Sequence, residues 1–506
     1  MMNIKQAKDC IENTVRLYLK KNEFGEYRIP VVRQRPIFLL GAPGIGKTAI
    51  MEQIAQELSV GLVSYSMTHH TRQSALGLPF ISHRQYGGRE TAVSEYTMSE
   101  IIASVYEVME ESGTKEGILF LDEINCVSET LAPSMLQFLQ YKVFGRHSVP
   151  EGWVIVTAGN PPEYNKSVRE FDVVTMDRLK VLSVDADYPV WKEYARERGV
   201  HAAILNFLEL KKEYFYKIET TVNGRSYVTA RGWEDLSGIL ALYEEEGMKV
   251  DEALIGQYLH NEKIVREFAA YYDLFNKYKK EYETEEILSG TAPEQTAERA
   301  RIAAFDERLS LLGMLTDKVM SEMRENLESS DYLTDLFQGL RAVKAVVEKG
   351  CQEPVVVDML QSQAQARRQL LQSRQKAGNL SGEERRKSNR IIRFLEEAGR
   401  GIVLEASGSQ QEAFGFVKAR FEDELDRMKK ETVRIGGRLS HLFAFVEKAF
   451  PEGNEMLILV TELTVNQAGA GFISRFGCEP YQRYNERLML SERQSLLQEE
   501  IAALDL

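Results

Sequence analysis

Apolar runs alternate with amphipathic stretches over the first 187 residues of this 506-residue chain. The runs that predict buried strands are residues 36–40, 61–67, 117–125 and 152–160, with 180–184 as a fifth candidate. Between them apolar residues recur every three or four positions, as Ile50, Ile54 and Leu58 do, which is typical of helices. Strands that alternate with helices require right-handed crossovers, so the pattern predicts an α/β domain with a parallel sheet in three αβα layers.

One segment before the helix expected at residues 98–112 breaks this alternation. Gly77, Pro79, Gly87 and Gly88 punctuate a stretch of β-branched and aromatic residues. Such punctuation indicates a hairpin or a loop insertion. We therefore expect an inserted element on an otherwise regular α/β domain.

The pattern becomes helical from residue 188 onward. We expect a core over residues 1–187, a mostly helical segment over 188–248 with a polar turn at 222–226, and a helical region of unknown role over 249–506. Within that last region, residues 302–323 carry apolar positions at a spacing of three to four. That stripe fits either a coiled-coil seam or an ordinary core-facing helix, and the core-facing helix is favoured over so short a stretch.

Composition singles out three further segments of the C-terminal region. Residues 376–389 are polar, which predicts an exposed connection, and residues 456–490 are apolar, so they should pack against this chain or a partner. Basic residues gather between 367 and 393, where Glu383 stands four positions before Lys387. That spacing allows intrahelical ion pairs, so a solvated helix face is favoured over a nucleic-acid contact.

The loop after the first strand has the composition of a phosphate-binding loop. Its residues are Gly41, Ala42, Pro43, Gly44, Ile45, Gly46, Lys47 and Thr48. They fit G-x-x-x-x-G-K-[ST] between a strand and a helix. Glycines let backbone N–H groups close around phosphates, and the helix N-terminus adds positive potential. Lys47 can reach the β- and γ-phosphates and the Thr48 hydroxyl can ligate Mg²⁺, so we expect a nucleotide site.

Two other expected strands end in polar residues that suit nucleotide hydrolysis. The third run ends near Asp122 and Glu123, where the first acid can assist Mg²⁺ and the second can polarise the attacking water. Adjacent acids can also begin a loop or cap a helix, but the loop upstream favours the catalytic interpretation. The fourth run ends in Asn160, whose amide can hold the lytic water, although asparagine before proline also makes a turn on local grounds.

Five motifs in order resemble those of the AAA+ ATPases over roughly residues 30–245: GAPGIGKT, LFLDEIN, TAGNPPEYN, MDRL and TARGWEDLS. The glycine-leucine-proline segment before the expected hairpin, the asparagine–proline turn and the T-x-R-x-W-E form of the last motif are most similar to the MoxR-like branch. The resemblance implies a P-loop ATPase core with ATP and Mg²⁺ as cofactors. It also implies that residues 188–248 form an α-helical lid.

The same resemblance gives roles to two arginines. Arg178 in MDRL corresponds to the arginine finger, which reaches the γ-phosphate of a neighbouring subunit, and Arg231 in TARGWE corresponds to the sensor-2 arginine of the lid. A guanidinium suits both roles because it is permanently charged, planar and able to donate two hydrogen bonds. Without the motif order both would be taken for surface ion-pair partners, and Arg146 and Arg169 are lesser candidates for the finger. A finger in trans implies an oligomer, by resemblance a hexameric ring.

For function, the resemblance implies a motor that remodels or matures a protein client together with a von Willebrand factor A-domain protein. Two alternatives stay open: a nucleic-acid-associated AAA+ motor or loader, and a scaffold that ATP stabilises with little turnover. Leu78 and Phe80, before and within the expected hairpin, either face a central pore and grip substrate or are tucked away.

Net charge and cysteine content limit the expected ligands and the expected cellular compartment. The net charge of −13 argues against general nucleic-acid binding. The four cysteines, which form no C-x-x-C pattern, predict neither a disulfide framework nor a zinc site and suit a reducing cytoplasm; they are Cys10, Cys126, Cys351 and Cys478. No apolar signal core or run long enough for a bilayer is present, and a metal role for the pair His69–His70 is disfavoured. We expect a cytoplasmic protein.

Overall fold

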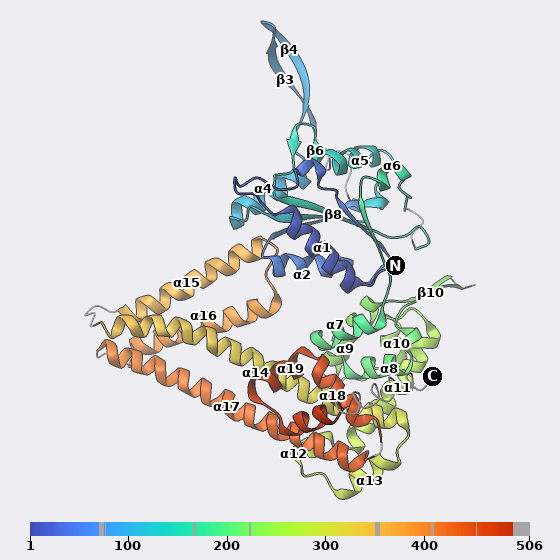
Figure 1. Ribbon diagram of the computed structural model, residues 1–506, viewed down its shortest axis with the longest axis vertical. Helices are drawn as coiled ribbons and strands as arrows, with labels where there is room; N and C mark the ends of the chain where they lie inside the picture. The colour runs from blue at the N-terminus through green and yellow to red at the C-terminus, as the bar shows by residue number, and fades with distance from the viewer. Residues whose placement is uncertain are drawn as a thin grey trace, which may run out of the picture. The chain divides into compact units, whose positions relative to one another are not determined.

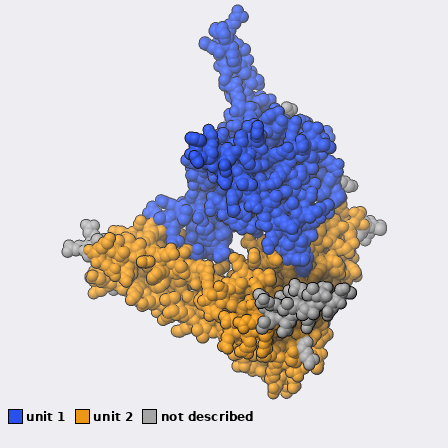
Figure 2. Space-filling view, viewed as in Figure 1, with its two compact units in different colours: residues 1–190, 365–388 blue, residues 191–364, 389–506 orange. Residues whose placement is uncertain are grey.

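The computed structural model describes residues 1–69, 75, 77–164, 168–221, 224–349, 355–405, 409–451 and 453–488. The chain divides into two compact units, coloured blue and orange in Figure 2. Unit 1 comprises Met1–Val190 and Gln365–Ser388, and unit 2 comprises Trp191–Ala364 and Asn389–Leu506. Each unit is therefore built from segments that are far apart in the sequence.

Five parallel strands form the sheet of unit 1. They are β1 (Ile37–Gly41), β2 (Gly61–Ser66), β5 (Gly117–Asp122), β8 (Trp153–Gly159) and β9 (Lys180–Val184). Their order across the sheet is β2-β5-β8-β1-β9, and every neighbouring pair is parallel. All residues of β8 are buried, as expected for an inner strand covered on both faces. All five strands match the apolar runs of the sequence.

Helices cover the two faces of this sheet (Figure 1). They are α1 (Ile4–Tyr18), α2 (Lys47–Leu58), α4 (Glu100–Ser112), α5 (Ala132–Tyr141) and α6 (Val173–Met176), with 3-10 turns at Val31–Arg33, Met67–His69 and Ile124–Cys126. Side chains of α4 and α5 share one buried cluster with the strands, while α1 packs against α2 and α2 contacts β5. The predicted three-layer αβα core is confirmed.

The insertion expected before α4 is an antiparallel hairpin. Its strands are β3 (Pro79–Tyr86) and β4 (Arg89–Tyr96), and a shorter hairpin pairs β6 (Val143–Phe144) with β7 (His147–Ser148). The β3–β4 hairpin extends away from the sheet at the top of Figure 1. The side chains of Leu78 and Phe80 are 54% and 44% exposed. They are therefore not tucked against the core.

The described residues of unit 2 form helices and one hairpin. Its shorter helices are α7 (Tyr188–Arg198, which begins in unit 1), α8 (Ala202–Leu210), α9 (Ala230–Glu245), α10 (Glu252–Ile255), α11 (Glu262–Glu281), α12 (Thr284–Ser289), α13 (Glu294–Ile302), α18 (Glu455–Val465) and α19 (Gln467–Phe476), with a 3-10 turn at Lys212–Tyr214. The hairpin pairs β10 (Lys217–Thr221) with β11 (Gly224–Val228). The sequence indicated only a polar turn there and missed both strands, which β-branched residues such as Ile218 and Thr220 favour.

Four long helices complete the chain: α14 (Phe305–Val347), α15 (Val355–Lys376), α16 (Gly382–Glu405) and α17 (Gln410–Ala449). The core of unit 2 joins α14 and α17 with α12, α13, α18 and α19, so the apolar segment after residue 456 packs within this chain. The predicted stripe over 302–323 is interrupted, because α13 ends at Ile302 and α14 begins at Phe305, both exposed. From Leu309 onward the stripe is buried among several helices, which is the core-facing arrangement.

The segment 376–389 contains the tip of the α15–α16 hairpin and the first turns of α16, and all of it except Asn389 belongs to unit 1. The prediction of an exposed connection was wrong at Ala377, which is 2% exposed. The backbone N–H of Leu62 donates to the Ala377 carbonyl at 2.8 Å, and the Asn379 side-chain amide donates to the Val60 carbonyl at 3.1 Å. Polar composition did not distinguish a solvated loop from a loop whose backbone is held by such bonds.

Several basic residues between 367 and 393 are paired with carboxylates. The pairs are Arg374 with Glu384, Lys376 with Glu111, Arg390 with Glu424 and Arg393 with Glu397. These pairs favour the solvated-face interpretation.

Among the residues that the structure describes, no single helix is long and apolar enough to cross a bilayer. Only α18 and α19 taken together have the required length and apolar character, and an 84° bend separates them.

Candidate functional site

The predicted phosphate-binding loop, residues 41–48, joins β1 to α2. Gly44 and Gly46 have φ values of +72° and +94°, which residues with a side chain rarely adopt. A Cβ on Gly41 would lie 2.6 Å from the backbone oxygen of Val184 in β9. The backbone itself therefore requires these glycines, and the loop leads into the first turn of α2, where backbone N–H groups are available to an anion.

The side chain of Lys47 connects this loop to β8. It is only 9% exposed, and its ammonium donates to the carbonyls of Gly41 at 2.7 Å and Ala42 at 2.8 Å. A third hydrogen bond runs from Lys47 Nζ to Asn160 Oδ1 at 2.8 Å. Because Gly41 ends β1 and Asn160 follows β8, one ammonium group bridges two neighbouring strand ends.

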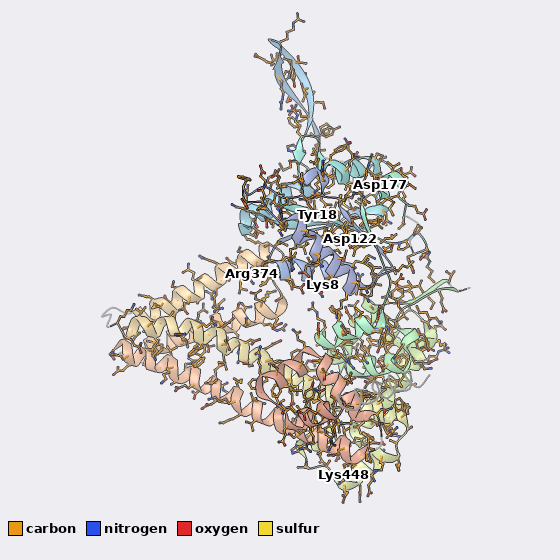
Figure 3. The ribbon with its side chains drawn as sticks, viewed as in Figure 1. Lys8, Tyr18, Asp122, Asp177, Arg374 and Lys448 are labelled. Atoms are coloured by element: carbon orange, nitrogen blue, oxygen red, sulfur yellow. The ribbon has the colours of Figure 1, made fainter. Side chains whose placement is uncertain are left out.

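Thr48 and Asp122 meet beside the same loop. The Thr48 hydroxyl donates to Asp122 Oδ2 at 3.1 Å, and Asp122, labelled in Figure 3, is the last residue of β5. Mg²⁺ prefers such oxygen groups and usually takes one or two protein ligands beside water and substrate phosphates. This hydroxyl–carboxylate pair, next to a loop of phosphate-binding geometry, fits Mg²⁺ bound with ATP.

Glu123 is held by two hydroxyl groups. Its Oε2 accepts hydrogen bonds from Ser66 Oγ at 3.0 Å and from Thr68 Oγ1 at 3.1 Å, and its backbone is left-handed with φ of +56°. Ser66 ends β2 and lies beside Asp122 in the β2–β5 register. The sequence analysis missed both hydroxyl residues. Their signal was a hydroxyl-rich end of the second strand, but only the sheet order places that end beside the acids.

Asn125 is a second residue that the sequence analysis missed. It is 4% exposed, and its side-chain amide donates to the backbone carbonyl of Asn160 at 2.8 Å. Its Oδ1 is buried without a hydrogen-bond partner among the described residues. A Cβ on Gly159 would lie 2.4 Å from that Oδ1, so Asn125 packs directly on the end of β8 and braces Asn160 there.

Thiol chemistry is not favoured at this site. Burial, together with the negative charges of Glu123 and Asp122, raises the pKa of the Cys126 thiol, so this thiol stays protonated at neutral pH. Within the described part of the chain, no group of three or more His, Cys, Asp or Glu side chains is placed to hold a metal ion. His70 lies outside the described residues.

Arg178 follows the short helix α6 and is exposed. Its Nη1 donates to Gln140 Oε1 at 2.7 Å, and no ion pair with a carboxylate is found for it among the residues described. Hydrogen bonds from Thr175, with a smaller contribution from the charge of Arg178, lower the pKa of Asp172. The lesser candidates differ, since Arg146 pairs with Glu95 and Arg169 with Glu129.

The structure thus brings five predicted site residues together at the carboxyl ends of three strands: Lys47, Thr48, Asp122, Glu123 and Asn160. Arg178 lies on the surface of the same unit. Arg231 belongs to unit 2, where it is an exposed residue in the first turn of α9, directly after the helix start at Ala230.

Comparison with known families agrees with this geometry. Residues 37–175 match the family model described as the ATPase family associated with various cellular activities (AAA). That range contains the loop, both acids and Asn160. No curated protein matches the chain. Residues 37–175 therefore form a domain of the AAA type, and such a domain implies nucleotide binding and ATPase activity in general terms.

Proposed function

We propose that this chain hydrolyses ATP with Mg²⁺ at the strand-end site of unit 1. The observation that carries the proposal is a pair of hydrogen bonds, Lys47 to Asn160 and Thr48 to Asp122. Together they gather the ends of β1, β8 and β5 around one glycine-rich loop. Polar groups from separate strands therefore converge at the carboxyl edge of the sheet. Ligand sites of α/β sheets are typically built at this edge.

Lys47 and Thr48 have the binding roles in this proposal. The Lys47 ammonium exchanges Asn160 and the loop carbonyls for oxygens of the β- and γ-phosphates. Thr48 and Asp122 would hold Mg²⁺, directly or through its water shell, and the ion would supply positive charge against the phosphoryl group being transferred. Loop residues from Gly41 to Gly46, except Pro43, which has no backbone N–H, surround the phosphates with backbone N–H groups.

Glu123 and Asn160 have the catalytic roles. Glu123 polarises the attacking water, while the hydroxyls of Ser66 and Thr68, both bonded to its Oε2, fix the direction in which the carboxylate points. Asn160, once released by Lys47, positions the water and contacts the γ-phosphate. The described arrangement is therefore a resting state, in which Lys47 holds Asn160 and two hydrogen bonds hold the catalytic carboxylate in one direction.

We further propose that the active form is an oligomer, a hexameric ring by resemblance to AAA+ ATPases. Arg178 is exposed and contacts the neutral amide of Gln140, so its charge remains available to a phosphate bound in a neighbouring subunit. Arg231, on α9 of the proposed lid over residues 188–248, would act on the nucleotide of its own subunit. Membership of the MoxR-like branch, a protein client and a von Willebrand factor A-domain partner belong to the same proposal.

The support for that branch is the ordered motif set, the exposed β3–β4 hairpin and the T-x-R-x-W-E sequence at the start of α9. A cytoplasmic location is also proposed, because the described cysteines Cys10, Cys126 and Cys478 are thiols rather than disulfides. The ion pairs in the basic stretch weaken the nucleic-acid alternative.

A phosphate-release assay separates the three functions. We expect Mg²⁺-dependent turnover of ATP that is insensitive to DNA and RNA and unchanged in an Arg385→Ala/Arg386→Ala variant. Negligible turnover with intact ATP binding would instead support the scaffold. Turnover that nucleic acid stimulates, and that the double variant loses, would support the nucleic-acid motor.

A further inference from the structure

The tip of the α15–α16 hairpin occupies the open edge of the ATPase sheet. β2 is the last strand on its side of the sheet, so one row of its backbone groups has no strand partner. The tip supplies two of the missing bonds: Leu62 N–H to the Ala377 carbonyl, and the Asn379 amide to the Val60 carbonyl. Edge groups of this kind must be satisfied or shielded, and here a distant segment of the chain does so.

The contact is close and fixes the tip in place. Gly378 has a φ of +71°, and a Cβ there would lie 2.7 Å from the Leu62 backbone oxygen. Ser373 Oγ donates to the Ser112 carbonyl at the end of α4 at 2.8 Å, and Lys376 pairs with Glu111 at 3.5 Å. The tip is therefore attached both to the edge strand and to the neighbouring helix.

The two helices behind the tip are themselves tied together and lead into unit 2. Arg374, labelled in Figure 3 at the end of α15, forms an ion pair with Glu384 at the start of α16. Residues 365–388 belong to unit 1, while the rest of both helices belongs to unit 2. Two continuous helices thus connect unit 2 to the edge of the ATPase sheet.

β2 connects this edge to the catalytic carboxylate. The tip contacts Val60 and Leu62, and four residues after Leu62 the strand ends at Ser66, whose hydroxyl, with that of Thr68, holds Glu123. At roughly 3.3 Å per residue the path along the strand is about 13 Å. β2 runs without a break from the tip contacts to Ser66, which is paired with Asp122 of β5, so this strand is the direct path from the tip to the acids.

We propose that tip residues 377–379 are positioning residues for Glu123. They act through β2 and the hydroxyls of Ser66 and Thr68: while the tip is docked Glu123 is held back, and when the tip is released Glu123 is free to reach water. The inference rests on the proposed ATP hydrolysis. It gives the helical C-terminal region a role, which is to set the hydrolysis rate through the hairpin.

The test uses the full chain with the tip loosened by Gly378→Ala/Asn379→Asp. The first change places a methyl group against Leu62, and the second replaces the donor to Val60 by a carboxylate of the same shape. Arg385→Ala is the matched control, because Arg385 is exposed on the same hairpin. We expect the tip variant to raise kcat by about five-fold, the factor that one hydrogen bond of about 1 kcal/mol corresponds to, with KM for ATP unchanged.

The same tip substitutions in a chain that lacks the Ser66 and Thr68 hydroxyls distinguish positioning of Glu123 from simple shielding of the sheet edge. In Ser66→Ala/Thr68→Ala the tip variant should give no further rise in kcat, because both changes act on the same hydrogen bonds. A tip variant that lowers the melting temperature but leaves kcat unchanged would overturn the proposal. So would a rise in kcat that persists fully in the Ser66→Ala/Thr68→Ala background.

Hydrogen–deuterium exchange tests the coupling without any turnover. Backbone amides over residues 63–69 should exchange faster in the tip variant than in Arg385→Ala, in the absence of nucleotide. Unchanged exchange there would overturn the proposal even in an active enzyme. If the wild type hydrolyses no ATP, the proposed function fails, and this exchange measurement still decides whether the tip controls the end of β2.

Discussion

The strand-end site of unit 1 and the helix pairs of unit 2 use charged side chains in different ways. In unit 1, Lys47 reaches backbone carbonyls and a neutral amide, and Asp122 and Glu123 accept hydrogen bonds from hydroxyls. Neither acid meets a cation in those contacts. In unit 2, by contrast, acids and bases from different helices neutralise one another.

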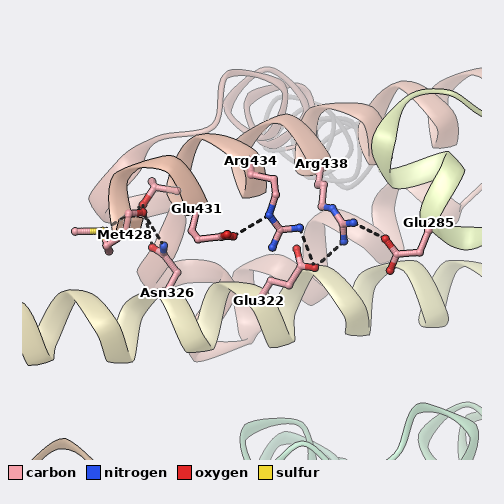
Figure 4. A network of polar contacts seen from close by, with 8 residues as sticks. Glu285, Glu322, Asn326, Met428, Glu431, Arg434 and Arg438 are labelled. Carbon is pink, nitrogen blue, oxygen red and sulfur yellow. Dashed lines mark hydrogen bonds and ion pairs between the residues drawn. The ribbon is translucent and has the colours of Figure 1, made fainter. Parts of the chain in front are cut away.

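The clearest case in unit 2 joins α14 to α17 (Figure 4). Glu322 Oε1 lies 2.6 Å from Arg438 Nη1 and 3.4 Å from Arg434 Nη1. Arg438 also pairs with Glu285 of α12, and Arg434 Nε lies 2.8 Å from Glu431. In this network each charged side chain forms an ion pair with another side chain of unit 2.

This difference distinguishes charged side chains that stabilise the fold from charged side chains that can bind a ligand. A charge that is matched by its opposite within the chain contributes to folding, and removing one partner leaves the other unpaired. A charge that hydrogen-bonds to neutral groups, as Lys47 does to the Gly41 and Ala42 carbonyls and to Asn160, can exchange those groups for a ligand of opposite charge. We therefore expect substitutions at the strand-end site to reduce ATP hydrolysis, and substitutions in the ion pairs of unit 2 to reduce stability.

The largest effect is expected from Glu123→Gln in unit 1. Binding of Mg·ATP should persist, since the loop and Thr48 are untouched, while hydrolysis should fall by on the order of 10³-fold or more. Thermal unfolding should change little, because the amide can still accept from Ser66 and Thr68. Titration calorimetry and phosphate release measure the two quantities, and unimpaired turnover would remove Glu123 from its catalytic role.

Arg178→Ala comes next: the proposed finger role predicts a loss on the order of 10³-fold in kcat. If Arg178 acts on a neighbouring subunit, as proposed, wild-type chain doped with Arg178→Ala chain should lose activity faster than dilution alone. Arg169→Ala, which breaks a pair with Glu129, is the control. A linear fall in activity with the doped fraction would argue against a finger in trans.

Glu322→Gln in unit 2 should have the opposite signature. It leaves Arg438, whose side chain is 13% exposed, with only the more exposed Glu285 as a counter-charge, so we expect a loss of roughly 2–3 kcal/mol in the free energy of unfolding. The affinity for Mg·ATP should stay the same. Glu431→Gln is the control, because an exposed pair is worth about 0–1 kcal/mol. Equal losses from the two changes would show that burial of this network is irrelevant.

A smaller effect, dependent on pH, is expected at Glu244 in unit 2. A hydrogen bond from His201 at 3.1 Å, only partly opposed by burial and supported by Lys279 at 3.0 Å, lowers the pKa of Glu244 to about 2. His201 Nδ1 accepts from the Ala203 N–H, so Nε2 carries the proton that Glu244 accepts.

The direction of the pH effect follows from that lowered value. A carboxyl with a depressed folded pKa adds stability above its unfolded value of about 4.3, and this stability is lost as pH falls toward 2. We expect about 2 kcal/mol of acid-dependent stability from Glu244, reduced by its partial exposure. Urea unfolding between pH 5 and pH 2 should show a flatter profile for Glu244→Gln. An unchanged profile would contradict this account of the pair.

Much of the fold of unit 1 could be predicted because the residues that indicate it are close together in the sequence. The loop residues are consecutive, Asp122 and Glu123 are adjacent, and each apolar run marks a strand. The parallel sheet then brings strand ends together without further knowledge. The αβα class and the placing of these residues at strand ends followed from these facts, whereas the contact of Lys47 with Asn160 also depends on β1 lying beside β8.

What the sequence did not reveal depends on contacts between distant segments. Ser66 and Thr68 meet Glu123 only because β2 lies beside β5, and Asn125 meets Asn160 only because β8 lies on the other side of β5. The tip at Ala377 contacts a strand that lies more than three hundred positions earlier in the chain. No periodicity or composition encodes such a pairing. The roles of Arg178 and Arg231 stay predictions.

The central claim is that residues from three strand ends converge on one triphosphate. A crystal or cryo-electron microscopy structure of the Glu123→Gln chain with Mg·ATP tests it most directly. The account predicts Lys47 Nζ on the β- and γ-phosphates and away from Asn160, with Mg²⁺ between Thr48, Asp122 and the phosphates. Nucleotide bound elsewhere, or bound while Lys47 keeps its contact with Asn160, would contradict it.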